Sequence, residues 1–301
     1  MVTHTEKWKR DGYLVFRRLL DQDNVNALRA ICDAALNQWC RQSTPENEPG
    51  GRCHKPDAWI MLHLNHPKYH PTSESLGTLL NTIAHPSILG VLDAVFREPA
   101  VHTQINYYID PSETRPSNWH RDCQFTANWA GENMNDLISR EGDPPREIHM
   151  HIPLASTSAS QVVPGSHIRP DTPKEHLIRT EDPHSENMPN AIQLPLEPGD
   201  IAFFHVNALH RGTYEAGVLR RTIAVTFNRI SDPRPATAES MAQRTGYVPS
   251  YQPWFRKPGY LHGCSPDAIE FYRRFIDLYE NSWSPDYLEG LPACVRDYYA
   301  P

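Results

Sequence analysis

Residues 198–210 read PGDIAFFHVNALH, and residues 220–227 read RRTIAVTF. Each stretch is a short apolar run that begins beside a turn or beside charged side chains, which indicates a buried strand. Similar runs recur along much of the chain. We expect strands at 12–19, 101–109, 147–154, 160–163, 191–195, 200–206 and 220–229. Short strands separated by turns are typical of a β-sandwich or a β-barrel.

The composition supports the same fold class. Proline accounts for 28 of the 301 residues, almost twice the usual share of about 5%. Helix bundles and parallel sheets tolerate so much proline poorly, whereas short strands with long loops accommodate it. Hydrophobic residues make up 39% of the chain, which suffices for a full core. We therefore expect an all-β core with flanking helices.

The flanking helices are expected on both sides of this core. Apolar spacing predicts a helix that starts after Asp21 or Asp23 and ends near Gln38. Further helices are expected at 75–96, with a break at Pro86, and at 266–280. Polar, proline-rich loops are expected at 110–117, 128–146 and 168–190.

No repeat, low-complexity tract or linker divides the sequence, so we expect a single domain over residues 1–301. Its parts would be N-terminal helices at 20–97, a jelly-roll core at about 100–230 and a C-terminal extension at 232–301.

Charge and hydropathy exclude several classes of function. Lys and Arg number 29 and Asp and Glu number 36, a formal net charge of −7 that argues against nucleic acid as a partner. No apolar run approaches the ~18–20 residues of a membrane helix, so we expect no membrane partner. Six cysteines without a C-x-x-C pair and the lack of a signal-peptide core near the first residues favour a cytoplasmic protein. A homodimer is one assembly that these features allow.

Two histidines, one aspartate and a pair of arginines form a candidate metal site. His120 and Asp122 form an H-x-D triplet, and residues two apart on a strand point to the same face. His210 ends one apolar strand, and Arg220 and Arg221 open the next. Two histidines and one carboxylate can occupy one face of an octahedral ion, as in non-haem Fe(II) oxygenases. A buried guanidinium requires an anion, and its planar fork suits the far carboxylate of a dicarboxylic co-substrate.

The chain also contains GYLVFRRLL at 12–20 before a helix, WHRD at 119–122, VVPGSH at 162–167 and PGD at 198–200. In this order the motifs resemble those of the phytanoyl-CoA dioxygenase family of Fe(II)/2-oxoglutarate-dependent oxygenases. The resemblance covers about residues 10–230 and implies a double-stranded β-helix, a cupin-like jelly roll whose open end holds the metal. It further implies that the chain uses Fe(II), 2-oxoglutarate as co-substrate and O2.

Carried over by position, the resemblance implies that His120, Asp122 and His210 are the catalytic iron ligands. The related halogenases replace the carboxylate with a small residue, so the presence of Asp122 disfavours halogenation. The sequence departs from the family just after the distal histidine, where the usual H-G-S is replaced by His210, Arg211 and Gly212, and a serine contact is missing. The tail at 232–301 is also longer than the family leads us to expect.

The resemblance also implies residues that bind 2-oxoglutarate. The arginine that pairs with its C5 carboxylate would be Arg220 or Arg221. The family's usual spacing, about eleven residues after the distal histidine, implies Arg221. The basic, small and apolar residues that often follow the family's arginine favour Arg220, which we prefer. In that register Arg220 and Thr222 share a strand face, so the hydroxyl could join the same carboxylate. Asn118 and Gln104 are further candidates for contact with 2-oxoglutarate.

The remaining histidines are expected to have other roles. His149 and His151 form H-x-H on a predicted strand and are expected to line the co-substrate or substrate pocket rather than to bind a metal. His205 is expected to be packed or hydrogen-bonded, and His167 to stabilise a turn. We expect a solvated surface around His54, His63, His66 and His70.

The expected reaction is the 2-oxoglutarate-dependent oxidation of a small organic or specialised-metabolite substrate, with release of succinate and CO2. Hydroxylation is the default outcome, and desaturation, cyclisation and epoxidation stay open. A zinc-dependent hydrolase or lyase with the same ligands is the alternative class, but it would leave the paired arginines without a purpose.

Overall fold

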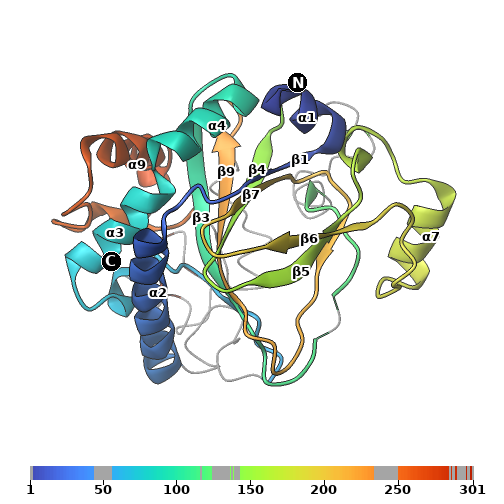
Figure 1. Cartoon of the computed structure of the whole chain (residues 1–301). Coiled ribbons are helices and arrows are strands. Elements are labelled where there is room, and N and C mark those ends of the chain that lie inside the picture. Colours follow the sequence, from blue (N-terminus) through green and yellow to red (C-terminus); the bar gives the residue numbers. More distant parts are fainter. Residues whose placement is uncertain are drawn as a thin grey trace.

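Two antiparallel sheets face each other in the computed structural model and form the β core (Figure 1). The larger sheet has the strand order β1-β7-β4-β9-β3-β2, and the smaller sheet has the order β6-β5-β8. The strands of the larger sheet are β1 (Tyr13–Phe16), β2 (Ile60–Met61), β3 (Ala100–Ile109), β4 (Glu147–Pro153), β7 (Ile201–His205) and β9 (Arg221–Arg229). The strands of the smaller sheet are β5 (Thr157–Val162), β6 (Ile192–Leu196) and β8 (His210–Gly212).

The structure describes residues 3–43, 56–115, 117–123, 136, 138, 143–233, 250–284, 286, 289, 296 and 299. Within these residues the helices are α1 (His4–Asp11), α2 (Gln22–Gln42), α3 (Ser73–Ile83), α4 (Pro86–Phe96), α7 (Pro173–Glu181) and α9 (Pro266–Tyr279). Short 3-10 turns are η1 (Pro67–Tyr69), η2 (Ser166–Ile168), η3 (Pro253–Arg256) and η4 (Glu280–Ser282). An all-β core with flanking helices, as predicted, is therefore confirmed.

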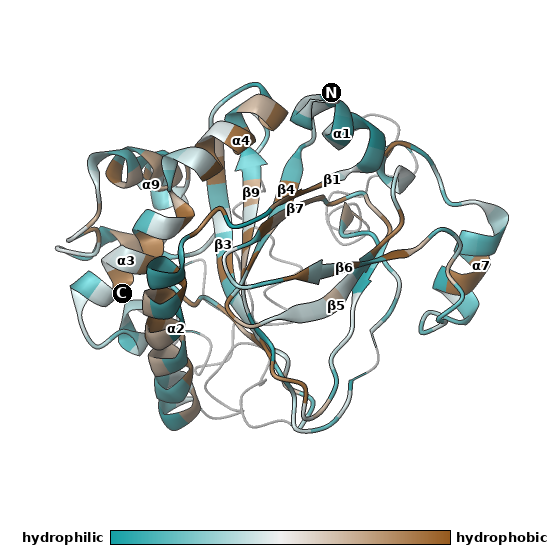
Figure 2. Cartoon of the chain, viewed as in Figure 1, coloured by the Kyte–Doolittle hydropathy of each residue, from teal (hydrophilic) through white to brown (hydrophobic). Residues whose placement is uncertain are grey.

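Local sequence explains where the predicted helices begin. The carboxylate of Asp21 accepts a hydrogen bond from the backbone N–H of Asn24 at 2.8 Å and caps α2. The predicted break at Pro86 separates α3 from α4, because proline lacks the N–H that a continuous helix needs but suits the first turn of a new one. Figure 2 shows α1 as mainly hydrophilic, in keeping with its place at the surface.

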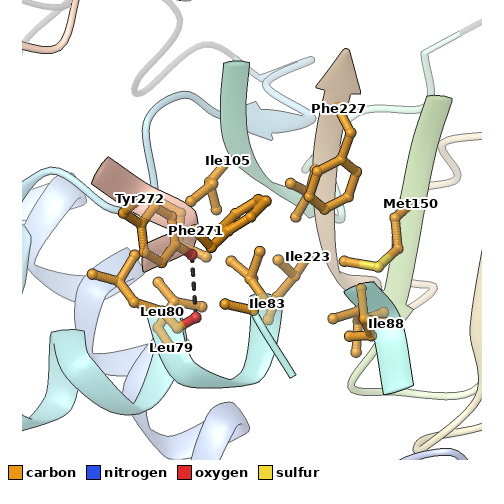
Figure 3. Packing of buried hydrophobic residues seen from close by; sticks show 14 of the residues in the cluster. Leu79, Leu80, Ile83, Ile88, Ile105, Met150, Ile223, Phe227, Phe271 and Tyr272 are labelled. Carbon is orange, nitrogen blue, oxygen red and sulfur yellow. Dashed lines mark hydrogen bonds between the residues drawn. The ribbon is translucent and has the colours of Figure 1, made fainter. Parts of the chain in front are cut away.

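The outer face of the larger sheet carries the main hydrophobic core (Figure 3). Ile223 and Phe227 of β9 pack there with Ile83 of α3, Ile88 of α4 and Phe271 of α9. The hydroxyl of Tyr272 donates to the backbone oxygen of Leu80 at 3.1 Å and links α9 to α3. Helix α9 belongs to the C-terminal extension, so part of this extension closes the core.

No single described helix is both long and apolar enough to cross a membrane. Helices α3 and α4 reach that length and hydropathy only when they are taken together, and they are bent by 41° at the break between them.

The inner face of the larger sheet is lined by alternate residues of the same strands, because side chains on a strand point to opposite faces in turn. Thr222, Ala224 and Thr226 of β9 face inward. Cross-strand pairing aligns Thr222 with Tyr108 of β3 and Pro153 of β4. It aligns Ala224 with Asn106 and His151, and Thr226 with Gln104 and His149. These inward rows, rather than the outer ones, carry the polar residues of the candidate site.

Three expectations about local structure were wrong or incomplete. The expected loop at 168–190 contains helix α7, which begins with a capping box of Thr172 and Glu175. His63 and His66, expected on a solvated surface, are buried against Trp254. Helix α1 and strands β2 and β8 were not predicted. His54 and most of the expected loop at 128–146 lie outside the described residues.

Candidate metal centre

Three side chains from two separate segments converge at one point inside the β core. They are His120, Asp122 and His210, and their candidate ligand atoms all lie within 4.8 Å of one another. Nε2 of His120 is 3.4 Å from Oδ1 of Asp122, and Nε2 of His210 is 3.3 Å from Oδ2 of the same carboxylate. Two imidazole nitrogens and a carboxylate oxygen at this spacing can share one metal ion.

The backbone brings the two histidines together. His120 and His210 form an antiparallel bridge in which each backbone N–H donates to the other's carbonyl oxygen, both at 3.0 Å. Two residues further on, the N–H of Asp122 donates to the carbonyl oxygen of Val206 at 2.9 Å. The segment that contains the H-x-D triplet therefore runs beside the turn before β8, and it presents Asp122 on the same side as both imidazoles.

Both imidazoles are oriented by a hydrogen bond through their second nitrogen. Nδ1 of His120 lies 2.8 Å from the carbonyl oxygen of Asn118, and Nδ1 of His210 lies 2.8 Å from that of Ala208. A carbonyl oxygen can only accept, so Nδ1 carries a proton in each ring, and Nε2 is the nitrogen that faces Asp122. A metal would bind through Nε2 in place of any proton there, with the other nitrogen held by an outer partner.

The carboxylate of Asp122 is held in its charged form. Burial raises its pKa, but the adjacent imidazoles of His210, His149 and His120 lower the pKa well below its usual range. Its Oδ2 atom is buried and has no hydrogen-bond partner among the described residues, although Nδ1 of His149 lies 3.2 Å away. An anionic oxygen of this kind fits a divalent metal ion, so the residues present match the metal that the sequence motif implies.

Arg220 and Arg221 have different surroundings. Arg221 faces outward, where Nε lies 3.2 Å from Oδ1 of Asp33 on α2 and Nη1 donates to Asp110. Arg220 is only 4% exposed, and within the described part of the chain its guanidinium has no carboxylate partner. Nη1 of Arg220 donates to the carbonyl oxygen of Thr213 at 3.2 Å, while Nε is buried and has no hydrogen bond to any residue that the structure describes.

Arg220 is held by aromatic rings. Its guanidinium carbon lies 5.0 Å from the ring centre of Tyr108 and 4.4 Å from that of Tyr214. The hydroxyl of Thr222, on the same face of the strand, is buried and has no hydrogen-bond partner among the residues described. A buried cation with an adjacent free hydroxyl is an incomplete site, and the carboxylate of a bound molecule would complete it.

Gln104 and Asn118, the other two candidates for contact with 2-oxoglutarate, have different surroundings. The side chain of Gln104 points into the core and donates from Nε2 to Oγ1 of Thr226 at 2.7 Å. The side chain of Asn118 is exposed, and its contribution is the backbone oxygen that orients His120. His149 lies next to Asp122 and also contacts Glu147, with Nε2 3.2 Å from Oε1.

The sequence reasoning missed the aromatic residues around Arg220. Tyr108 lies on a predicted strand, and period-two alternation alone would have placed it on the inner face with Gln104. Tyr214 follows β8, which was not predicted, so no sequence signal pointed to it.

Comparisons with known proteins agree with this fold. A family model described as phytanoyl-CoA dioxygenase (PhyH) matches residues 8–216. The solved structure of AviO1 from Streptomyces viridochromogenes Tue57 is similar, with a TM-score of 0.56, 18% identity, and coverage of 77% of this chain and 96% of that chain. EctD from S. alaskensis with 2-oxoglutarate and 5-hydroxyectoine gives a TM-score of 0.56 at 17% identity, with 77% of each chain covered. The EctD structure with bound Fe gives 0.56 at 16% identity, again with 77% of each chain covered. No curated protein matches the sequence.

Proposed function

The chain belongs to the phytanoyl-CoA dioxygenase family of Fe(II)- and 2-oxoglutarate-dependent oxygenases, and from this premise we propose that it hydroxylates a small organic molecule. The family uses Fe(II), 2-oxoglutarate and O2, and the similar jelly-roll structures include one solved with Fe and one solved with 2-oxoglutarate. His120, Asp122 and His210 would hold the iron. The observation that carries the proposal is the convergence of their ligand atoms within 4.8 Å, with both imidazoles oriented to present Nε2.

The three proposed ligands would hold the iron through two imidazole nitrogens and one carboxylate oxygen, which leaves coordination positions for the co-substrate and oxygen. When bound, iron and 2-oxoglutarate supply the activation of dioxygen, and the keto acid leaves as succinate and CO2. The charge on Asp122 would offset part of the metal charge in the buried site.

Arg220 and Thr222 would bind the C5 carboxylate of 2-oxoglutarate. A guanidinium presents parallel donors that match a carboxylate, so it would hold the keto-acid end toward the metal ligands. This positioning determines which end of the co-substrate meets the metal. Arg221 is already paired with Asp33 and Asp110, which supports the choice of Arg220.

Anaerobic titration tests the proposal directly. Fe(II) and 2-oxoglutarate added together to the intact chain should give a weak visible charge-transfer band, which neither gives alone. The variant His210→Ala should lose the band, because one of the three proposed ligands is gone. A zinc-dependent hydrolase would give no such band with the wild-type chain, and that result would overturn the proposal.

Product analysis tests the reaction type. Candidate substrates that increase succinate release would be analysed by mass spectrometry. Hydroxylation adds one oxygen atom to the substrate, whereas desaturation or ring formation removes two hydrogen atoms. A product without added oxygen would retain the oxygenase class and overturn the hydroxylase assignment.

A further inference from the structure

Beside Arg220, the side chain of Tyr214 lies directly against the backbone of Gly212. Gly212 stands two residues after His210, where the family resemblance leads to a serine. A Cβ atom added to Gly212 would lie 2.9 Å from Oη of Tyr214, 3.3 Å from its Cζ, and 3.4 Å from Nη1 of Arg220. The hydroxyl of Tyr214 therefore fills the space in which the side chain of residue 212 would otherwise begin.

Several contacts hold Tyr214 in this position. Its ring centre lies 4.7 Å from that of Trp59 and 4.4 Å from the guanidinium carbon of Arg220. Its backbone oxygen accepts a hydrogen bond from the N–H of Arg115 at 2.9 Å. The side chain is thus clamped between an aromatic ring and the buried cation, and the hydroxyl has little freedom to leave the site.

Oη of Tyr214 and Nη1 of Arg220 both lie within 3.4 Å of the position that a Cβ atom of residue 212 would take, so the hydroxyl and the guanidinium are neighbours. Burial raises the pKa of Tyr214, the largest of the effects that act on it, so the phenol keeps its proton at neutral pH. The phenol therefore has an O–H to donate beside the guanidinium of Arg220. An anion placed against Arg220 would accept this hydrogen bond.

Unsatisfied groups around Arg220 indicate where such an anion would lie. Nε of Arg220 and Oγ1 of Thr222 are both buried without hydrogen-bond partners in the described part of the chain. Tyr108, which stands across the sheet from Thr222, contacts both Arg220 and Tyr214, with the two tyrosine ring centres 6.5 Å apart. Arg220, Thr222 and Tyr214 therefore form one group of donors to which no described residue supplies a carboxylate.

We propose that Tyr214 binds the co-substrate: its hydroxyl donates a hydrogen bond to the C5 carboxylate of 2-oxoglutarate beside Arg220 and Thr222, and so replaces the serine hydroxyl that Gly212 lacks. This inference rests on the proposed function, because it needs 2-oxoglutarate to bind at Arg220. It assigns a role to a residue that the iron-ligand motif does not include.

The variant Tyr214→Phe tests the inference, because it removes the hydroxyl and keeps the ring that stacks on Arg220. Binding of 2-oxoglutarate to the Fe(II)-loaded chain would be measured without oxygen by calorimetry. Loss of one hydrogen bond to a charged group predicts a dissociation constant raised by about tenfold or more. Binding of 2-oxovalerate, a keto acid of the same chain length without the second carboxylate, should be unchanged by the substitution.

A serine introduced at residue 212 provides a rescue experiment for the 2-oxoglutarate affinity that Tyr214→Phe should lose. In the wild-type background Gly212→Ser should weaken 2-oxoglutarate binding, because the new Cβ would press on Oη of Tyr214. In the Tyr214→Phe background that oxygen is gone, and Gly212→Ser should restore part of the lost affinity for 2-oxoglutarate. A purely structural role of Tyr214 would not produce this reversal of sign.

The outcomes separate the two proposals. Equal affinity of wild type and Tyr214→Phe for 2-oxoglutarate would overturn the role of Tyr214 and leave the oxygenase assignment intact. Equal weakening of 2-oxoglutarate and 2-oxovalerate would also overturn it, because the effect would not depend on the second carboxylate. If the wild-type chain bound no 2-oxoglutarate, the proposed function and this inference would both fail.

Discussion

Arg121 donates two hydrogen bonds to one carboxylate oxygen of Asp171, from Nε at 2.9 Å and from Nη2 at 2.7 Å. Arg121 is fully buried and stands between the two proposed ligands of the H-x-D triplet. Its Nη1 also donates to the carbonyl oxygens of Ser166, at 2.6 Å, and Asn207. One side chain therefore ties the first two ligands to the turn that leads to the third.

Replacing Arg121 with methionine should destabilise the fold strongly. The substitution removes the fully buried partner of Asp171, which keeps only Arg179 at 2.8 Å, and it takes the buried donor away from the carbonyl oxygens of Ser166 and Asn207. The loss of this buried network should cost about 3–5 kcal/mol. Chemical denaturation would measure the loss. The control is Arg274→Met, because Arg274 pairs with the exposed Glu270 and should lose less than about 1 kcal/mol. Similar losses for the two variants would contradict the importance of the buried pair.

Replacement of Arg220 should weaken 2-oxoglutarate binding, whereas replacement of Arg221 should lower the stability of the fold. Arg220→Ala should raise the dissociation constant of 2-oxoglutarate by about 100-fold, because the proposed site loses its cation. Arg221→Ala should leave this constant nearly unchanged and should lower stability by about 1–3 kcal/mol, since Asp33 and Asp110 lose their shared partner. Calorimetry and denaturation on the same two proteins would check both effects. A large loss of 2-oxoglutarate affinity only in Arg221→Ala would show that the arginine was misassigned.

His102 should make stability depend on pH. It is fully buried among the rings of Phe255, Tyr272 and Phe275, and neither ring nitrogen has a hydrogen bond to a described residue. Burial lowers its pKa from about 6.5 to about 3. The unfolded chain therefore binds more protons than the folded chain between these values, and stability falls as the pH drops below about 6.5.

The variant His102→Leu removes this titration. The difference in unfolding free energy between variant and wild type should move in favour of the variant by about 2 kcal/mol from pH 7 to pH 5. Thermal or urea unfolding across this range would measure the change. Parallel pH profiles for the two proteins would contradict the expectation.

Helix α9 should be essential for the stability of the core. Phe271→Ala would open a cavity between α9 and the larger sheet and should cost about 3–5 kcal/mol. The matched control is Leu177→Ala on α7, whose side chain is mostly exposed and should change stability by less than about 0.5 kcal/mol. A small effect at Phe271 would mean that the C-terminal extension is dispensable for folding.

Local signals account for the parts of the fold that could be predicted from the sequence. The strands around Ile223 and Phe203 were predictable because a short apolar run bounded by turns or charges strongly favours a buried strand. The convergence of His120, Asp122 and His210 also agrees with the motif, since the relevant residues stand at fixed offsets on adjacent segments. Helix α7 was predictable in principle from Thr172 and Glu175, but the neighbouring prolines and polar residues obscured it.

Other features depend on contacts between distant parts of the chain. His63 is buried because Trp254 and Tyr299 pack against it, and its own neighbours in sequence carry no sign of this. The choice between Arg220 and Arg221 depends on Asp33, which lies on another element. The position of Tyr214 depends in the same way on Trp59, whose ring stands beside it.

The reciprocal backbone pairing of His120 and His210 has a consequence for assembly. Because each histidine is fixed by the other's main chain, the conformational entropy needed to gather the two imidazoles is lost when the protein folds, before any ion arrives. The apo-protein is thus preorganised, and ion capture requires little further ordering of these two side chains.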